Sequence, residues 1–150
     1  MDPEAVSPPT PPSKKPRFVI FLHGGTYDKL HQAATIGMTA AAMGKDVYVF
    51  LMFWAIKKLA MGELDRLDFS PAYEMHAEEV ARIMTEKKVP KISEMFEEAR
   101  QVGSFKLIAC SAGLEYMSVK YEDFASKVDD VLGLPLILNL AADAETTLFI

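Results

Sequence analysis

Cys110 is the only cysteine of the chain and the side chain best suited to chemistry. It follows the apolar run 105–109 and precedes Ser111-Ala112-Gly113, a pattern that predicts a buried strand leading into a helix. The first turn of a helix has unpaired N–H groups and the positive end of the helix dipole, which favour a thiolate over a thiol. Because the thiolate is the reactive form, we predict that Cys110 is a nucleophile. The alternative interpretation is a small buried hydrophobic residue.

Other residues with binding chemistry follow the predicted strands. His23 comes directly after the apolar run 17–22, where an imidazole could support a thiolate. The glycine pair after it, with the helix start that follows, could hold an anion on backbone N–H groups. Trp54 and Phe53 either line this pocket or fill the core, and core packing is the simpler interpretation. The predicted substrate or anion site consists of His23, Gly24, Gly25, Ser111, Gly113 and Trp54.

Two other kinds of site are disfavoured by order and spacing. Residues 109–113 resemble a relaxed nucleophile elbow with Ser111 in the serine position, but that fold places its histidine after the serine. His23, His31 and His76 all precede it. Three scattered histidines and one cysteine have no metal-ligand spacing, so we expect no metal. The chain lacks the G-x-G-x-x-G and Walker patterns, and no cofactor is predicted.

Composition restricts the classes of partner and compartment. The net charge of −5 argues against nucleic-acid binding, which needs a basic surface. No apolar run reaches the roughly 20 residues that span a bilayer, so no stable membrane insertion is expected. A single cysteine makes no internal disulfide, and the start of the chain is acidic and proline-rich, unlike a signal peptide. We expect a cytoplasmic protein.

The distribution of prolines predicts the domain organisation. Residues 1–16 contain six of the nine prolines, which support neither a helix nor a central strand. We predict a disordered proline-rich tail over 1–16 and one domain over 17–150. His31 falls inside the first predicted helix of this domain and is expected at the surface.

The apolar patterns predict an α/β domain in which strands alternate with helices. Such alternation implies a parallel sheet covered on both faces, with ligands beyond the carboxyl ends of the strands. That edge would collect residues 23–29, 53–56 and 110–113. The last helix is apolar nearly all round and needs cover from another subunit. The predicted strands are 17–22, 47–52, 105–109, 127–131 and 146–150, and the predicted helices are 26–43, 53–60, 71–88, 92–102, 111–119 and 134–142.

Six short segments follow one another along the chain in an order and spacing typical of one family. They are the opening strand with Asp28-Lys29, and residues 40–47, 53–54, 88–91, 107–110 and 142–143. Over about residues 17–150, this series resembles the DsrE/DsrF-like sulfur-relay family, and within it the DsrE-like, peroxiredoxin-like branch. Residues 61–85 depart from the pattern, because they are shorter and more charged than the methionine-rich segment of related chains.

The resemblance implies a three-layer α/β/α domain with a five-stranded parallel sheet, DsrEFH-like with a flavodoxin-like wrap. It also implies assembly into trimers or hexamers. Family members carry sulfur as a cysteine persulfide between donor and acceptor proteins, and Cys110 occupies the position of their cysteine. Partner or membrane contacts that the middle segment makes elsewhere are not transferred to this chain.

These arguments lead to one hypothesis and two alternatives. We predict that Cys110 accepts a sulfane sulfur and passes it to a thiol of another molecule, since the chain has no second cysteine. The expected partners are sulfur donor and acceptor proteins or small thiols, and Gly113 would let a bulky acceptor approach. One alternative is a non-catalytic oligomeric or small-ligand-binding module with a structural cysteine. The other is a one-cysteine thiol peroxidase, although the usual Thr-x-x-Cys pattern is absent because position 107 is Leu. Whether the protein is an enzyme, such as a sulfurtransferase, stays open.

Overall fold

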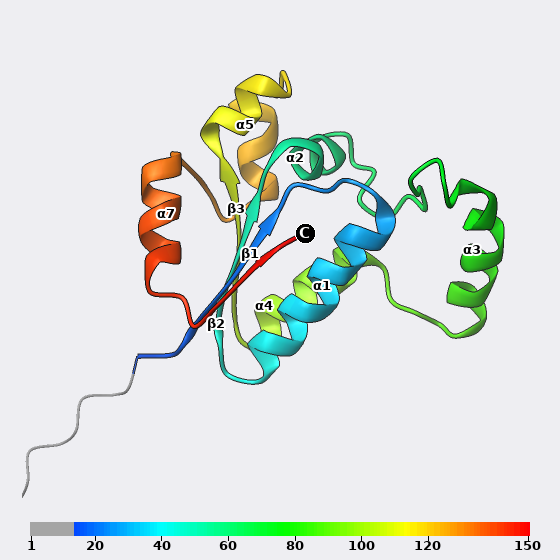
Figure 1. Ribbon diagram of the computed structural model, residues 1–150, viewed down its shortest axis with the longest axis horizontal. Helices are drawn as coiled ribbons and strands as arrows, with labels where there is room; N and C mark the ends of the chain where they lie inside the picture. Colours follow the sequence, from blue (N-terminus) through cyan, green and yellow to red (C-terminus); the bar gives the residue numbers. More distant parts are fainter. Residues whose placement is uncertain (1–13) are drawn as a thin grey trace, which may run out of the picture.

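The computed structural model describes residues 14–150, so most of the predicted tail (1–13) lies outside the described residues. Five strands pair in parallel in the order β4-β3-β2-β1-β5 (Figure 1). The predicted five-stranded parallel sheet is confirmed. Its order is not the 2-1-3-4-5 of flavodoxin itself, although helices wrap both faces. The strands are β1 (Arg17–Leu22), β2 (Asp46–Leu51), β3 (Ser104–Cys110), β4 (Asp130–Leu132) and β5 (Thr146–Phe149).

Helices form a layer on each side of this sheet. In Figure 1, α1 and α4 lie on one face and α7 lies on the other. Among the described residues, no helix is long and apolar enough to cross a membrane. The helices are α1 (Tyr27–Ala42), α2 (Phe53–Ala60), α3 (Ala77–Glu86), α4 (Ile92–Val102), α5 (Ser111–Tyr116), α6 (Tyr121–Phe124) and α7 (Leu134–Ala142), with short 3-10 turns η1 (Glu74–His76) and η2 (Ala125–Lys127).

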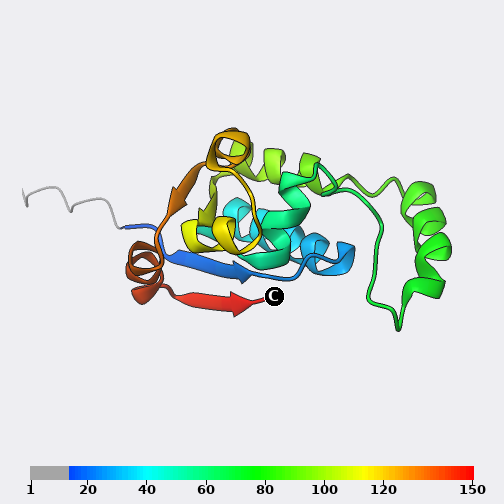
Figure 2. The ribbon, with the colours of Figure 1, turned by 90° about the horizontal axis from the view of Figure 1, so that it is seen from above.

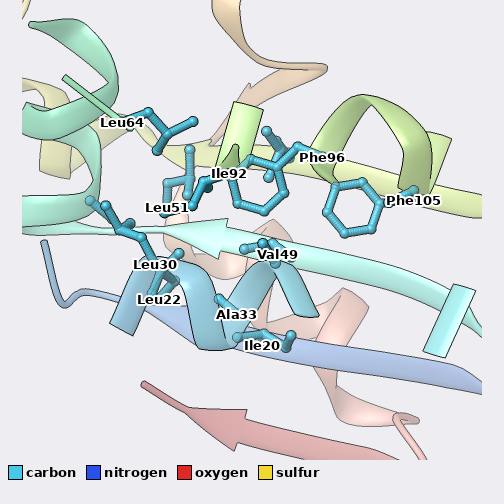
Figure 3. Close-up of a cluster of buried hydrophobic side chains, with 14 of the residues drawn as sticks. Ile20, Leu22, Leu30, Ala33, Val49, Leu51, Leu64, Ile92, Phe96 and Phe105 are labelled. Carbon is cyan, nitrogen blue, oxygen red and sulfur yellow. The ribbon is translucent and has the colours of Figure 1, made fainter. Parts of the chain in front are cut away.

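The larger core lies between the sheet and the layer of α1 and α4 (Figure 3). Small residues on the inner face of α1, among them Ala33, Ala34 and Gly37, are buried there. A Cβ atom added at Gly37 would lie 2.8 Å from the ring of Phe105 on β3. Side-chain size at this position therefore sets how closely α1 approaches the sheet.

The second core lies under α7, on the opposite face of the sheet. Ile137 of α7 is fully buried there against strand residues that include Phe21, Phe50 and Cys110. The ring of Phe21 stacks on Phe149 with centroids 5.0 Å apart and lies 5.2 Å from Phe50. Aromatic side chains thus continue from the covered centre of this face to the edge strand β5.

Of the predicted elements, the helix over 71–88, between β2 and α4, differs most from the structure. Only Ala77–Glu86 is α-helical, after turns and η1, and none of its residues is buried. Figure 2 shows α3 standing apart from the sheet. Helices in proteins are stabilised mainly by packing of their apolar face. The residues before Ala77 have little surface to pack on, and they form turns.

Two further boundaries differ from the sequence prediction. The helix expected over 111–119 ends at Tyr116, and Ser118 has φ of +53°. The fourth strand begins only at Asp130. Before it, Asp129 bonds Leu107 of β3 twice: its N–H donates to the carbonyl of Leu107 at 2.8 Å, and its carboxylate accepts the N–H of Leu107 at 2.7 Å. Helix α4 ends at Val102 as predicted, and Gly103, which follows it, has an extended backbone.

Candidate functional site

The carboxyl edge of the sheet brings together the three predicted segments. The backbone N–H groups of His23 and Gly24 donate to the carbonyl of Ile150, at 2.9 and 3.2 Å, which fixes the turn after β1. Met52 N–H donates to the carbonyl of Leu22 at 2.9 Å and holds the start of α2 beside that turn. Cys110, at the end of β3, completes the edge.

Cys110 is the last residue of β3 and directly precedes α5, as the sequence predicts. Its backbone is extended, and the residue is only 6% exposed in the isolated chain. Hydrophobic side chains on the α7 face surround it, including Ile108, Phe50 and Ile137. Ser111, next in the chain, is exposed. Little of the Cys110 residue therefore reaches solvent in the single chain.

Gly113 holds α5 against α2. A Cβ atom at Gly113 would lie 2.6 Å from Cδ1 of Ile56, which is fully buried, and 3.7 Å from Cβ of Cys110. Helix packing therefore explains this glycine. Gly113 is itself buried, so the structure gives no support to the expectation that it opens an approach for an acceptor.

A separate cavity of 730 Å³, which we call the β1–α2 cavity, opens between the turn after β1, helix α2 and the loop that follows α2. Four of the predicted site residues line it, whereas Cys110, Ser111 and Gly113 do not. The predicted site therefore consists of two places. The lining residues are His23, Gly24, Gly25, Thr26, Lys29, Trp54, Lys57, Lys58, Met61, Glu63, Arg66 and Asp68.

The first turn of α2 separates the cavity from Cys110. Phe53 faces α5, with its ring 6.2 Å from Tyr116, and Trp54 packs its Cβ against Gly25. Phe53 has φ of +44°, a left-handed conformation that is costly for a non-glycine residue. The interpretation of these aromatics as core is wrong, because Phe53 is 47% and Trp54 59% exposed. They begin a helix at the open edge of the sheet, where little chain covers them.

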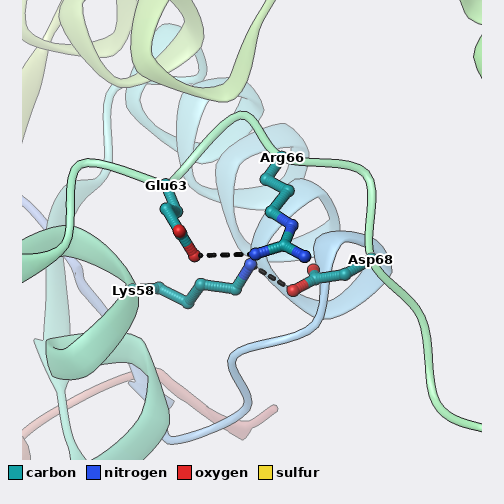
Figure 4. Close-up of polar contacts among 4 residues, drawn as sticks. All are labelled: Lys58, Glu63, Arg66 and Asp68. Carbon is teal, nitrogen blue, oxygen red and sulfur yellow. Dashed lines mark hydrogen bonds and ion pairs between the residues drawn. The ribbon is translucent and has the colours of Figure 1, made fainter.

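Ion pairs order the wall of the cavity that the loop forms (Figure 4). Lys58 of α2 is almost completely buried and pairs with Asp68. Arg66 pairs with Glu63 at 3.3 Å. Lys57 Nζ donates to the carbonyl of Met117 at 3.2 Å and links α2 to the end of α5. These charged residues escaped the sequence analysis because they lie 34 to 45 residues beyond His23 (57 − 23 and 68 − 23) and no local motif joins them to it.

His31 is the histidine whose placement departs from expectation. It is partly buried rather than a surface residue, and its Nδ1 lies 3.3 Å from Oγ1 of Thr35. Its Nε2 is buried with no hydrogen-bond partner among the described residues. Across residues 14–150, no three His, Cys, Asp or Glu side chains gather in a way that could hold a metal ion.

Comparison with known proteins identifies the family. A family model described as the DsrE/DsrF/DrsH-like family matches residues 14–82 and 74–149. The chain belongs to this family. The two matched ranges overlap at residues 74–82. This overlap contains η1 and the start of α3, the helix that stands apart from the sheet.

This DsrE-like chain was also compared with solved structures and with curated proteins. Among solved structures, the ychN protein from E. coli matches with a TM-score of 0.47 and 16% sequence identity. The match covers 90% of this chain and 99% of that chain. No curated protein matches the sequence significantly.

Proposed function

We propose that this DsrE-like protein is a sulfur carrier that holds sulfane sulfur on Cys110. The observation that supports this most directly is the position of the only cysteine in a chain of this family. It stands at the carboxyl end of β3, immediately before α5, where α/β sheets usually place their chemistry.

The proposed reaction is two thiol exchanges without net oxidation. The Cys110 thiolate attacks the outer sulfur of a donor persulfide or polysulfide, whose S–S bond breaks, and the shortened donor leaves with the electron pair. An acceptor thiolate then attacks the outer sulfur of the Cys110 persulfide, and the Cys110 thiolate is released. With no second cysteine in the chain, the acceptor thiol belongs to another molecule.

The partners are therefore sulfur donor and acceptor proteins or small thiols, in the cytoplasm. They would approach from the side of Ser111 and Ala112, because these first residues of α5 are exposed while the opposite side of Cys110 lies under α7. The low exposure of Cys110 predicts that a small movement of α5 precedes transfer.

Treatment of the purified protein with polysulfide, followed by intact-mass measurement, tests the proposal. We expect the mass of one added sulfur atom, lost again on incubation with a thiol. The matched control is Cys110→Ser, which has no thiol and stays unmodified. An unmodified wild-type mass, or an addition that persists in Cys110→Ser, contradicts the carrier function.

The second candidate is a binding or assembly module in which Cys110 is structural, and the 6% exposure of this residue favours it. It predicts that iodoacetamide alkylates Cys110 only after unfolding, whereas a carrier reacts in the native state. A one-cysteine peroxidase would instead form a sulfenic acid on peroxide treatment, which dimedone traps.

We further propose that copies of the chain associate through α7 and β5. Leu136, Leu138 and Phe149 are each more than half exposed, and Phe149 continues the aromatic stack of the sheet face. Large exposed apolar side chains gathered on one face of a protein support an interaction site there. A trimer or hexamer would supply the cover that α7 lacks in the single chain.

A further inference from the structure

The β1–α2 cavity is a concave site whose chemistry the sulfur-carrier proposal does not use. Its volume of 730 Å³ is within the range of small-molecule sites, about 300–1,000 Å³. Three chain segments build it, from the ends of β1 and β2 and from the loop after α2. Cys110 does not line it, so what binds there is a separate question from persulfide formation.

The charges of the lining favour an anion. Four lysines and arginines face two carboxylates, an excess of two positive charges in a chain whose net charge is −5. Both carboxylates are already paired, Asp68 with Lys58 and Glu63 with Arg66 (Figure 4). Lys57 bonds only a backbone carbonyl, and Lys29 has no hydrogen-bond or ion-pair partner within residues 14–150. Lys29 and Lys57 are thus the cations available to a ligand.

Residues at the start of α1 line the same space, and the N–H of Tyr27 there donates to the carbonyl of Asp68 at 2.8 Å. Thr26 is the N-cap of α1, a helix of 16 residues, yet its side chain makes no capping hydrogen bond. The N–H groups of Gly25 and Thr26 have no acceptor among the described residues. They add to the positive end of the α1 dipole. An anionic group between Lys29 and this helix start would satisfy donors that the described part of the chain leaves open.

Trp54 adds an aromatic surface to the lining. It is the only tryptophan of the chain, is 59% exposed, and is anchored by close packing of its Cβ against Gly25. A large exposed aromatic ring beside cations is a stacking surface for a planar ring. Because little of the described chain covers this ring, it is free to contact a ligand in the cavity.

We propose that the β1–α2 cavity binds a small organic anion with a planar ring, of the class of nucleoside monophosphates. The phosphate lies between Lys29, Lys57 and the start of α1, and the ring stacks on Trp54. The site works independently of Cys110.

Titration with AMP tests this, because fluorescence of the single tryptophan reports directly from the cavity. We expect saturable quenching, and a dissociation constant by calorimetry at least about tenfold lower than for adenosine or inorganic phosphate alone. Absence of saturable binding overturns the proposal. Equally tight binding of inorganic phosphate also overturns it, because the ring would then contribute nothing.

Matched charge reversals locate the site. Lys29→Glu should raise the dissociation constant for AMP at least about tenfold. Lys87→Glu, an exposed lysine outside the cavity, makes the same change in net charge and should leave it nearly unchanged. An equal effect of both variants overturns the assignment, provided that circular dichroism shows both to be folded. Cys110→Ser should bind AMP as the wild type does, so failure of the sulfur-carrier proposal and failure of this one remain distinguishable.

Discussion

At the scale of single residues, Phe53 and Trp54 lie between Cys110 and the β1–α2 cavity at the carboxyl edge of the sheet. Phe53 and Trp54 are neighbours in the chain, but Phe53 faces α5 and Trp54 faces the glycine turn. The left-handed backbone of Phe53, at the start of α2, costs about 1–3 kcal/mol. Conformational strain of this kind is concentrated at functional sites, and here it lies between Cys110 and the β1–α2 cavity.

Tyr27, at the start of α1, should make stability depend on alkaline pH. Burial raises the pKa of Tyr27 above its usual 10.0, and the negative charge of Asp65 raises it further. The folded state therefore holds the phenol proton more tightly than the unfolded chain. The resulting stabilisation is complete below pH 10 and is lost as the pH rises through the folded-state pKa.

Tyr27→Phe removes this titration. We expect its free energy of unfolding to fall less steeply above pH 10 than that of the wild type, as measured by urea unfolding at neutral and alkaline pH. Tyr73→Phe, at an exposed tyrosine, is the control and should follow the wild-type curve. A Tyr27→Phe curve parallel to the wild type would contradict the effect of burial.

At the scale of elements, the small residues on the inner face of α1 let this helix lie close to the sheet. Ala normally stabilises a helix by about 1 kcal/mol relative to Gly. At Gly37 its Cβ would lie 2.8 Å from the buried ring of Phe105, so steric crowding should win. We expect Gly37→Ala to lower the free energy of unfolding by about 1–3 kcal/mol in urea unfolding.

Two further variants check the cause. Gln32→Ala, on the exposed side of α1, should be neutral or slightly stabilising. Phe105→Leu should make Gly37→Ala less costly in a double-mutant cycle, because it removes the crowded ring. Additive effects of the two substitutions would exclude contact with Phe105 as the cause.

Gly103 shows why a sequence pattern can give the correct boundary for an incorrect reason. Its place after the stripe of α4 predicts a left-handed helix end, and Gly44 after α1 does have φ of +83°. Gly103 is extended instead, and a Cβ there would lie 2.5 Å from the carbonyl oxygen of Ala41. Close approach of α1, which no local pattern records, requires this glycine.

At the scale of the whole molecule, α7 is the only helix that covers its face of the sheet among the described residues. Leu136→Glu or Leu138→Glu places a charge on the proposed association surface. Each should shift the wild-type oligomer toward monomer in sedimentation velocity, because a carboxylate is costly to bury without a partner.

The control for this experiment is Val102→Glu on α4, an exposed apolar residue outside the surface. It should leave the association state unchanged. A wild-type protein that stays monomeric at every concentration tested, or a Val102→Glu variant that dissociates equally, would contradict association through α7 and β5.

The sequence by itself determined the parallel α/β sheet, the place of Cys110 at the end of β3 and the family. Each depends on local apolar periodicity or on the order of short segments. The tertiary structure alone decided that Cys110 is buried and that His23 and Trp54 belong to a different cavity. It also brought Lys58, Arg66 and Asp68 to that cavity. Burial and convergence depend on how distant segments pack, and the packing of α1, α2 and the loop after α2 leaves no periodic trace in the chain.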